Sequence, residues 1–112
     1  MELGKIGDFL NKEYIVTYED TADFLGNKGI VMLSTPAMIK YMEITAAEIV
    51  FSKLPENYRV VGTKIDINHI NPTPLNQKIV VKATISYIDD KKICYLVEAY
   101  NEKTKIGFGI YE

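Results

Sequence analysis

Apolar and polar residues alternate along most of the second half of the chain. A period of two is typical of a β-strand with one face buried and the other exposed. The alternating segments are separated by short runs rich in Asn, Asp, Pro and charged residues, which favour turns. This pattern predicts four strands, over Tyr58–Ile70, Gln77–Ile88, Lys91–Asn101 and Thr104–Tyr111.

The first half contains one predicted strand and one predicted helix. Residues Lys12–Tyr18 are rich in β-branched and aromatic side chains and predict a strand. Residues 19–33 predict a short turn or an irregular lid segment, with one helical turn near Thr21–Phe24. The sequence Ser34-Thr35-Pro36 is typical of a helix start, because a hydroxyl can cap free N–H groups and proline suits the first turn. The helix is predicted over Ala37–Lys53, with an apolar stripe of Met38, Met42, Thr45, Ala46, Ile49 and Val50.

The order strand, helix, four strands predicts an α+β fold in which an antiparallel sheet wraps around one long central helix. Short turns are expected to make neighbouring strands antiparallel. The length of 112 residues fits a single domain over residues 1–112. An open sheet edge favours pairing with a second copy, so we expect a symmetric homodimer with a ligand pocket between subunits.

Composition and charge exclude several classes of function. The net charge is −2 and the basic residues form no stripe, which argues against a nucleic-acid partner. No apolar run approaches the length of a membrane span, and the first residues lack the apolar region of a signal peptide. The single cysteine, Cys94, forms no internal disulfide and is interpreted as a core residue. We therefore expect a cytoplasmic protein that acts on a small molecule.

Three polar residues form a candidate catalytic set. Thr35 stands at the predicted helix start, Glu43 lies about two turns further along, and His69, the only histidine, lies near the end of the next strand. A hydroxyl, a carboxylate and an imidazole that converge can perform acyl transfer. Backbone N–H groups at the helix start or at Gly62 could hold the oxyanion. A lone histidine without a carboxylate cluster argues against a metal site.

Each candidate also has a structural interpretation. Thr35 can serve only as a helix cap, Glu43 can lie on a solvated face beside Lys40, and His69 can be an ordinary strand histidine. Gly62 can mark a bulge or a close packing contact. Asp66 and His69 are three positions apart on a regular strand, so the two are expected on opposite faces.

Three blocks of the sequence resemble the fluoroacetyl-CoA thioesterase-like family of hotdog proteins. The first is Ser34 to Glu43 followed by Ala46-Ala47, and the second is Val61 to His69 followed by Pro72-Thr73-Pro74. The third is Val97 to Asn101 followed by Ile106 to Gly109. The spacings between the blocks are similar as well, and the resemblance covers roughly residues 12–110.

The resemblance implies a hotdog-fold homodimer that hydrolyses short acyl-CoA thioesters without metal or redox cofactor. It implies that Thr35, Glu43 and His69 are catalytic and that Gly62 binds the substrate carbonyl. Where the fluoroacetyl-specific enzymes carry a gate of phenylalanines, this chain has Gly26-Asn27-Lys28-Gly29, with Phe24 the nearest aromatic residue. Selectivity for a fluorinated acyl group is therefore not expected.

Two alternatives remain open from the sequence. One is a non-catalytic hotdog module that binds acyl-CoA or another small ligand, because fold does not fix function. The other is a hydratase-type hotdog enzyme, which resembles a pattern with Asp and His close together on the helix. Residues 34–53 contain neither residue type, which argues against the hydratase.

Overall fold

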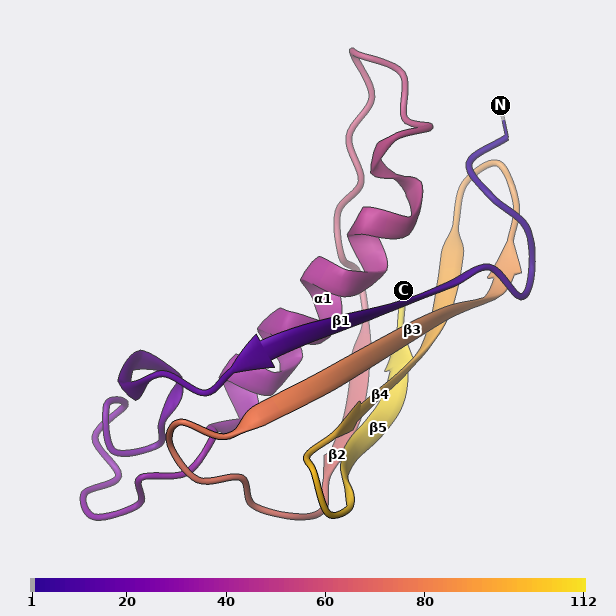
Figure 1. Cartoon of the computed structure of the whole chain (residues 1–112). Coiled ribbons are helices and arrows are strands. Elements are labelled where there is room, and N and C mark those ends of the chain that lie inside the picture. The colour runs from indigo at the N-terminus through magenta and orange to yellow at the C-terminus, as the bar shows by residue number, and fades with distance from the viewer. Residues whose placement is uncertain (1) are drawn as a thin grey trace.

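One sheet of five strands packs against one long helix. The computed structural model describes residues 2–112, and Figure 1 shows α1 lying along one face of the sheet. The predicted α+β architecture, an antiparallel sheet around one long helix, is confirmed. The elements are β1 (Phe9–Ile15), the 3-10 helix η1 (Tyr18–Asp20), α1 (Thr35–Phe51), β2 (Ile65–His69), β3 (Lys78–Ile88), β4 (Ile93–Tyr100) and β5 (Lys105–Tyr111).

The strands pair in the order β1-β3-β4-β5-β2, and every pair is antiparallel. Short turns join β3 to β4 and β4 to β5, as predicted. The implied pairing of β2 with β3 is wrong, because β2 lies at the far edge beside β5. The linking residues 70–77 hydrogen-bond elsewhere instead: the Leu33 N–H donates to the Thr73 carbonyl at 2.8 Å, and the Ile70 N–H donates to the Ile106 carbonyl at 2.8 Å.

Two predicted strands differ from the structure by three or more residues at one end or both, while the other three differ by one or two. β1 begins at Phe9 and ends at Ile15, three residues earlier than predicted at each end, because Thr17 already caps η1. That 3-10 turn replaces the helical turn predicted near Thr21–Phe24. β2 covers only Ile65–His69 of the predicted 58–70, and residues 58–64 lie outside the strand.

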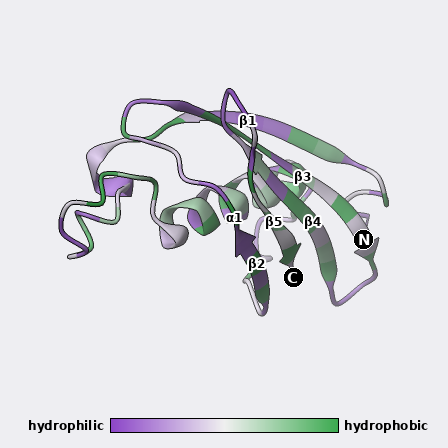
Figure 2. Ribbon diagram, turned by 90° about the horizontal axis from the view of Figure 1, so that it is seen from below, coloured by the Kyte–Doolittle hydropathy of each residue, from purple (hydrophilic) through white to green (hydrophobic). Residues whose placement is uncertain are grey.

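The helix begins at Thr35 and ends at Phe51, two residues earlier at each end than the predicted Ala37–Lys53. The Ser34 hydroxyl accepts a hydrogen bond from the Ala37 N–H at 3.2 Å, and proline occupies the first turn. Buried residues of α1 form one stripe against the sheet, and Figure 2 shows the strands curving past the helix. Across residues 2–112, no helix has both the length and the apolar character to cross a membrane. The buried helix residues are Ala37, Met38, Met42, Thr45, Ala46 and Val50.

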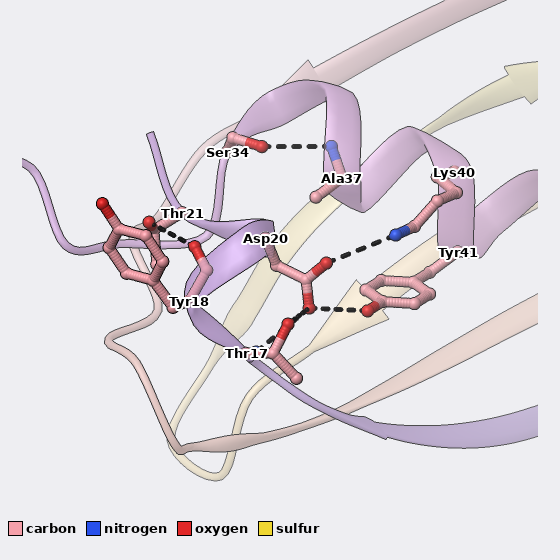
Figure 3. Close-up of polar contacts among 8 residues, drawn as sticks. All are labelled: Thr17, Tyr18, Asp20, Thr21, Ser34, Ala37, Lys40 and Tyr41. Atoms are coloured by element: carbon pink, nitrogen blue, oxygen red, sulfur yellow. Dashed lines mark hydrogen bonds and ion pairs between the residues drawn. The ribbon is translucent and has the colours of Figure 1, made fainter. Parts of the chain in front are cut away.

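A buried carboxylate ties the segment before the helix to the helix itself. Asp20 is 1% exposed, and its side chain accepts hydrogen bonds from the Thr17 N–H at 3.0 Å, the Thr17 hydroxyl at 3.0 Å and the Tyr41 hydroxyl at 2.6 Å (Figure 3). Lys40 forms an ion pair with it at 3.3 Å. Its backbone carbonyl accepts from the Ser34 N–H at 2.7 Å, so Asp20 contacts both the cap and the second turn of α1.

Two glycines in β5 allow close packing of the helix and of β2. Gly107 pairs with His69, and a Cβ built there would lie 2.6 Å from the Met38 side chain of α1. Gly109 pairs with Ile67, and a Cβ there would overlap the Asp66 carbonyl oxygen. Gly109 therefore requires glycine, because the backbone of β2 occupies the space of a side chain, while at Gly107 a side chain would displace the end of Met38.

We expect Tyr41→Phe to lower the free energy of unfolding by about 2 kcal/mol, because it removes a hydrogen bond to a buried, charged carboxylate. Urea unfolding followed by circular dichroism measures this change. Tyr100→Phe is the control, since its hydroxyl donates to Glu98 at an exposed site. An equal loss of unfolding free energy from the two substitutions would show that the hydrogen bond to Asp20 contributes no more than one at the surface.

Candidate active site

The structure brings Thr35 and His69 together. Thr35 is the first residue of α1, and His69 is the last residue of β2. The Thr35 hydroxyl oxygen and the His69 Nδ1 lie 2.8 Å apart and share a hydrogen bond. Because Ser34 serves as the cap, the Thr35 hydroxyl is free to make this contact. The cap interpretation of Thr35 is therefore wrong, and the capping role belongs to its neighbour.

The second ring nitrogen of His69 is free for other chemistry. Nε2 is buried and has no hydrogen-bond partner among residues 2–112. Burial lowers the pKa of His69, because a charged imidazolium is poorly solvated at this position. A neutral ring that donates from Nδ1 to Thr35 leaves a basic lone pair on Nε2, and the opposite tautomer leaves an N–H there. Either form offers one unpaired polar atom to a bound ligand.

Glu43 lies further along the helix and is half-buried. Eight residues of α-helix separate it from Thr35, or about 12 Å along the axis and roughly 80° around it. No hydrogen bond joins its carboxylate to Thr35 or His69 in the described chain. Its negative charge acts on Tyr111, whose pKa is raised first by burial and then by Glu43.

Gly62 lies on the exposed segment that precedes β2. A Cβ built on it would lie 2.7 Å from the Tyr111 hydroxyl, so a larger residue would displace that ring. The close-packing interpretation of Gly62 is supported by this contact. Gly62 thus packs against Tyr111 and Glu43 acts on it through its charge, while Thr35 and His69 are hydrogen-bonded to each other.

Tyr111 and Asp20 are two residues near the candidate site that the sequence pattern does not predict. Tyr111 ends the last strand, and its position near Glu43 and Gly62 follows from the β4–β5–β2 register, which sequence periodicity does not specify. Asp20 lies in a segment interpreted as irregular, where an acidic residue normally indicates solvent exposure.

Other residues considered from the sequence have structural surroundings. Cys94 is half-buried, and burial raises the pKa of its thiol, which disfavours the reactive thiolate. Asp66 is exposed while His69 is half-buried, in agreement with opposite faces of β2. Glu48 forms an ion pair with Lys12 at the surface.

Comparison with known proteins identifies the family. The family model of fluoroacetyl-CoA-specific thioesterase matches residues 16–112 of the chain. The chain belongs to this family. The matched region includes Thr35, Glu43, Gly62 and His69, and it covers nearly all of the predicted resemblance. A search of curated protein sequences gives no match.

Solved structures share the hotdog fold of this fluoroacetyl-CoA-specific thioesterase family member. The fluoroacetyl-CoA thioesterase superposes with a TM-score of 0.90 at 19% identity, over 96% of this chain and 84% of the other. A thioesterase superfamily member from Thermus thermophilus gives 0.86 at 26% identity, over 96% and 80%. A hot-dog-like protein from Thermanaerovibrio acidaminovorans gives 0.89 at 21% identity, over 97% and 81%. The predicted hotdog fold is confirmed.

The single histidine makes the protonation of this site directly measurable. We expect the His69 ring to titrate below the ordinary value of about 6.5 in folded protein, and near that value in urea-unfolded protein. Since the folded chain then binds this proton less readily than the unfolded chain, its contribution to stability is complete above the unfolded pKa. That contribution is lost as the pH falls through the folded pKa. NMR of the ring protons follows both titrations, and a folded midpoint above the unfolded one would contradict the burial.

Proposed function

We propose that the protein hydrolyses a small acyl-CoA thioester to the free acid and CoA. The observation that carries this proposal is the Thr35–His69 hydrogen bond with the buried, unpartnered Nε2 of His69 beside it. Family membership supports the same reaction class. Variants of the fluoroacetyl-CoA thioesterase have been crystallised with fluoroacetate and CoA and with acetyl-CoA, which supports an acyl-CoA ligand here.

In the proposed reaction, His69 acts on the attacking water. Thr35 accepts the Nδ1–H and fixes the ring, so that Nε2 takes a proton from water as its oxygen attacks the thioester carbon. The tetrahedral intermediate expels the CoA thiolate, and the imidazolium returns the proton to that sulfur. Two roles for Glu43 fit this reaction. It is either the base that takes the proton of the water in place of His69, or the nucleophile that displaces the CoA thiolate and forms a mixed anhydride, which water then hydrolyses to the free acid and the regenerated carboxylate.

The carbonyl oxygen requires N–H donors as it becomes negative. Gly62 is proposed to supply one from its backbone, and the N-terminus of α1 at Thr35 provides a favourable dipole. Because Glu43 does not contact His69, the thioester is proposed to lie between them, where it can meet both groups. No preference for a fluorinated acyl group is proposed, since Phe24, the nearest aromatic residue to Gly26–Gly29, is about half exposed.

Purified protein incubated with acetyl-, propionyl- and butyryl-CoA is expected to release free thiol. His69→Ala and Glu43→Ala should each reduce kcat/KM by at least 100-fold, the usual contribution of a general acid–base group. Ser34→Ala is the matched control, since it should lower stability by about 1 kcal/mol through loss of the cap while retaining turnover. No thiol release from any acyl-CoA by folded protein would contradict the proposal.

The same experiment separates the enzyme from a non-catalytic acyl-CoA binding module. Saturable binding of acetyl-CoA without turnover would favour the binding module. In that case His69→Ala should change affinity for acetyl-CoA and have no rate to change. Isothermal titration alongside the thiol assay measures both quantities.

We also propose a cytoplasmic homodimer that forms through the free edge of β2. Within residues 2–112, β2 pairs with β5 and with no other strand. The residues beside that open edge include exposed apolar side chains, with Val61 74% exposed and Ile65 38% exposed. Pairing of two such edges would satisfy free backbone groups and cover these side chains, and it would place the site near the subunit interface.

Sedimentation is expected to give about twice the chain mass of 12.7 kDa. Ile65→Lys should shift the protein to monomer, because it places a charge at the proposed interface. Ile15→Lys is the control, since Ile15 is 52% exposed on β1, the opposite edge strand. If the Ile15 substitution dissociates the dimer and the Ile65 substitution does not, the interface lies at β1 and the proposed β2 interface is wrong.

A further inference from the structure

The end of β2 is fixed by contacts other than regular strand pairing. In an antiparallel pair every second N–H of a strand faces its partner. The Ile70 N–H faces β5 and donates to the Ile106 carbonyl at 2.8 Å, so the next donor would be residue 72. That residue is Pro72, which has no N–H, and β2 ends at His69. The chain beyond His69 therefore needs another attachment to β5 if the histidine is to stay in place.

Asn71 supplies the missing donor with its side chain. The Asn71 Nδ2 donates to the Lys105 carbonyl at 2.8 Å, and the Asn71 backbone N–H shares the Ile106 carbonyl with Ile70, at 3.3 Å. The side-chain bond is partly buried, so a carbonyl that loses this donor is not fully compensated by water. Asn71 thus continues the attachment to β5 beyond the residue at which strand pairing stops.

The next two residues of this segment are held as well. The side-chain amide of Asn101, on the β4–β5 turn, donates to the Pro72 carbonyl and to the Thr73 hydroxyl, each at 3.3 Å. Thr73 is fully buried, and its carbonyl accepts from the Leu33 N–H at 2.8 Å. Leu33 directly precedes the cap of α1. The segment after β2 therefore connects β5 to the start of the helix, which are the two elements on either side of the imidazole.

The backbone of Asn71 also acts on the imidazole. Burial lowers the pKa of His69, and the Asn71 backbone raises it by a smaller amount. A backbone group that raises the pKa of an imidazole favours the charged ring, so this group is the carbonyl oxygen. No charged side chain within residues 2–112 contributes to the shift. The residue that anchors the end of β2 is thus also the one whose carbonyl lies near the ring.

We propose that Asn71 is a positioning residue for His69. Its side-chain bond to the Lys105 carbonyl holds the end of β2 against β5, which keeps the imidazole buried and within hydrogen-bond distance of Thr35. Asn71 acts through the histidine and not on the substrate. The expected effect on rate rests on the proposed hydrolysis, whereas the expected effect on the ring does not.

Asn71→Leu removes the amide donor, keeps nearly the same volume and retains the backbone carbonyl. The end of β2 is expected to detach from β5, so the imidazole becomes more exposed. Because burial is the larger of the two effects on the ring, its pKa should rise from the lowered value toward the ordinary value of about 6.5. NMR titration of the single histidine in the folded protein measures this change.

Asn68→Leu is the matched control. Asn68 lies one residue before His69 on the same strand, is exposed, and makes no side-chain hydrogen bond among the residues from 2 to 112. The same substitution there should leave the pKa of the ring unchanged. An unchanged ring pKa in folded Asn71→Leu protein, or an equal change in the Asn68 variant, would overturn the proposal.

Kinetics separate a positioning role from a purely structural one. In Asn71→Leu, kcat for acetyl-CoA should fall about 10- to 100-fold, as when a reacting group is misplaced by about 1 Å, while KM stays unchanged. The acidic limb of the kcat/KM profile, which reports the base of the free enzyme, should move to higher pH together with the NMR pKa. Wild-type kcat in the Asn71 variant would overturn the proposal.

Asn71→Ser is a second variant for the case that leucine disturbs the fold. Its hydroxyl lies one bond closer to the backbone than the amide nitrogen, so it does not reach the Lys105 carbonyl. It should raise the ring pKa and lower kcat in the same way. Failure of both variants to fold would make Asn71 a residue of the fold alone and overturn the proposal. A shifted ring pKa, with no thiol release by wild-type protein, would contradict the proposed hydrolysis and support the positioning of His69.

Discussion

The buried carboxylate of Asp20 is the interaction on which the geometry of the site depends. A charge removed from water is tolerated only when its oxygens are fully hydrogen-bonded, and here Thr17, Tyr41 and Lys40 provide the partners. The backbone carbonyl of the same residue holds the Ser34 N–H. One residue from the irregular segment therefore fixes the position at which α1 begins, and with it the position of Thr35.

The candidate site has two parts that the chain positions differently. Thr35 and His69 are held by the start of the helix and the end of β2, and their contact is already formed. Gly62 packs against Tyr111, and Glu43 acts on Tyr111 through its charge. Two turns of α1 separate Glu43 from Thr35, and the β5–β2 register sets where Tyr111 lies relative to His69. A substrate that bridges the two parts would bring the carboxylate and the imidazole to one carbon atom, which fits catalysis that depends on substrate positioning.

Much of the fold follows from the sequence, because its signals are local. The start of the helix is encoded in Ser34-Thr35-Pro36, and the strands β3, β4 and β5 follow from alternation with short turns. The placement of β2 beside β5 is not local, since it depends on where residues 70–77 find hydrogen-bond partners. Ser34, and not Thr35, caps the helix. Both residues carry a hydroxyl, so propensity alone does not show which of two adjacent residues is the cap. Tyr111 gains its place near Glu43 only through sheet register, so no sequence pattern could select it.

The two glycines of β5 make the Thr35–His69 contact sensitive to substitutions outside the candidate site. Gly107 faces His69 across the strand pair and leaves room for Met38, and Gly109 leaves room for the backbone of β2. These positions carry no polar side chain, yet a single methyl group at Gly109 would push the histidine-bearing strand outward, and one at Gly107 would displace the end of Met38. The distance between the His69 imidazole and the Thr35 hydroxyl thus depends on the absence of side chains at Gly107 and Gly109. A substitution at Gly109 would therefore move His69 away from Thr35 without changing either polar residue.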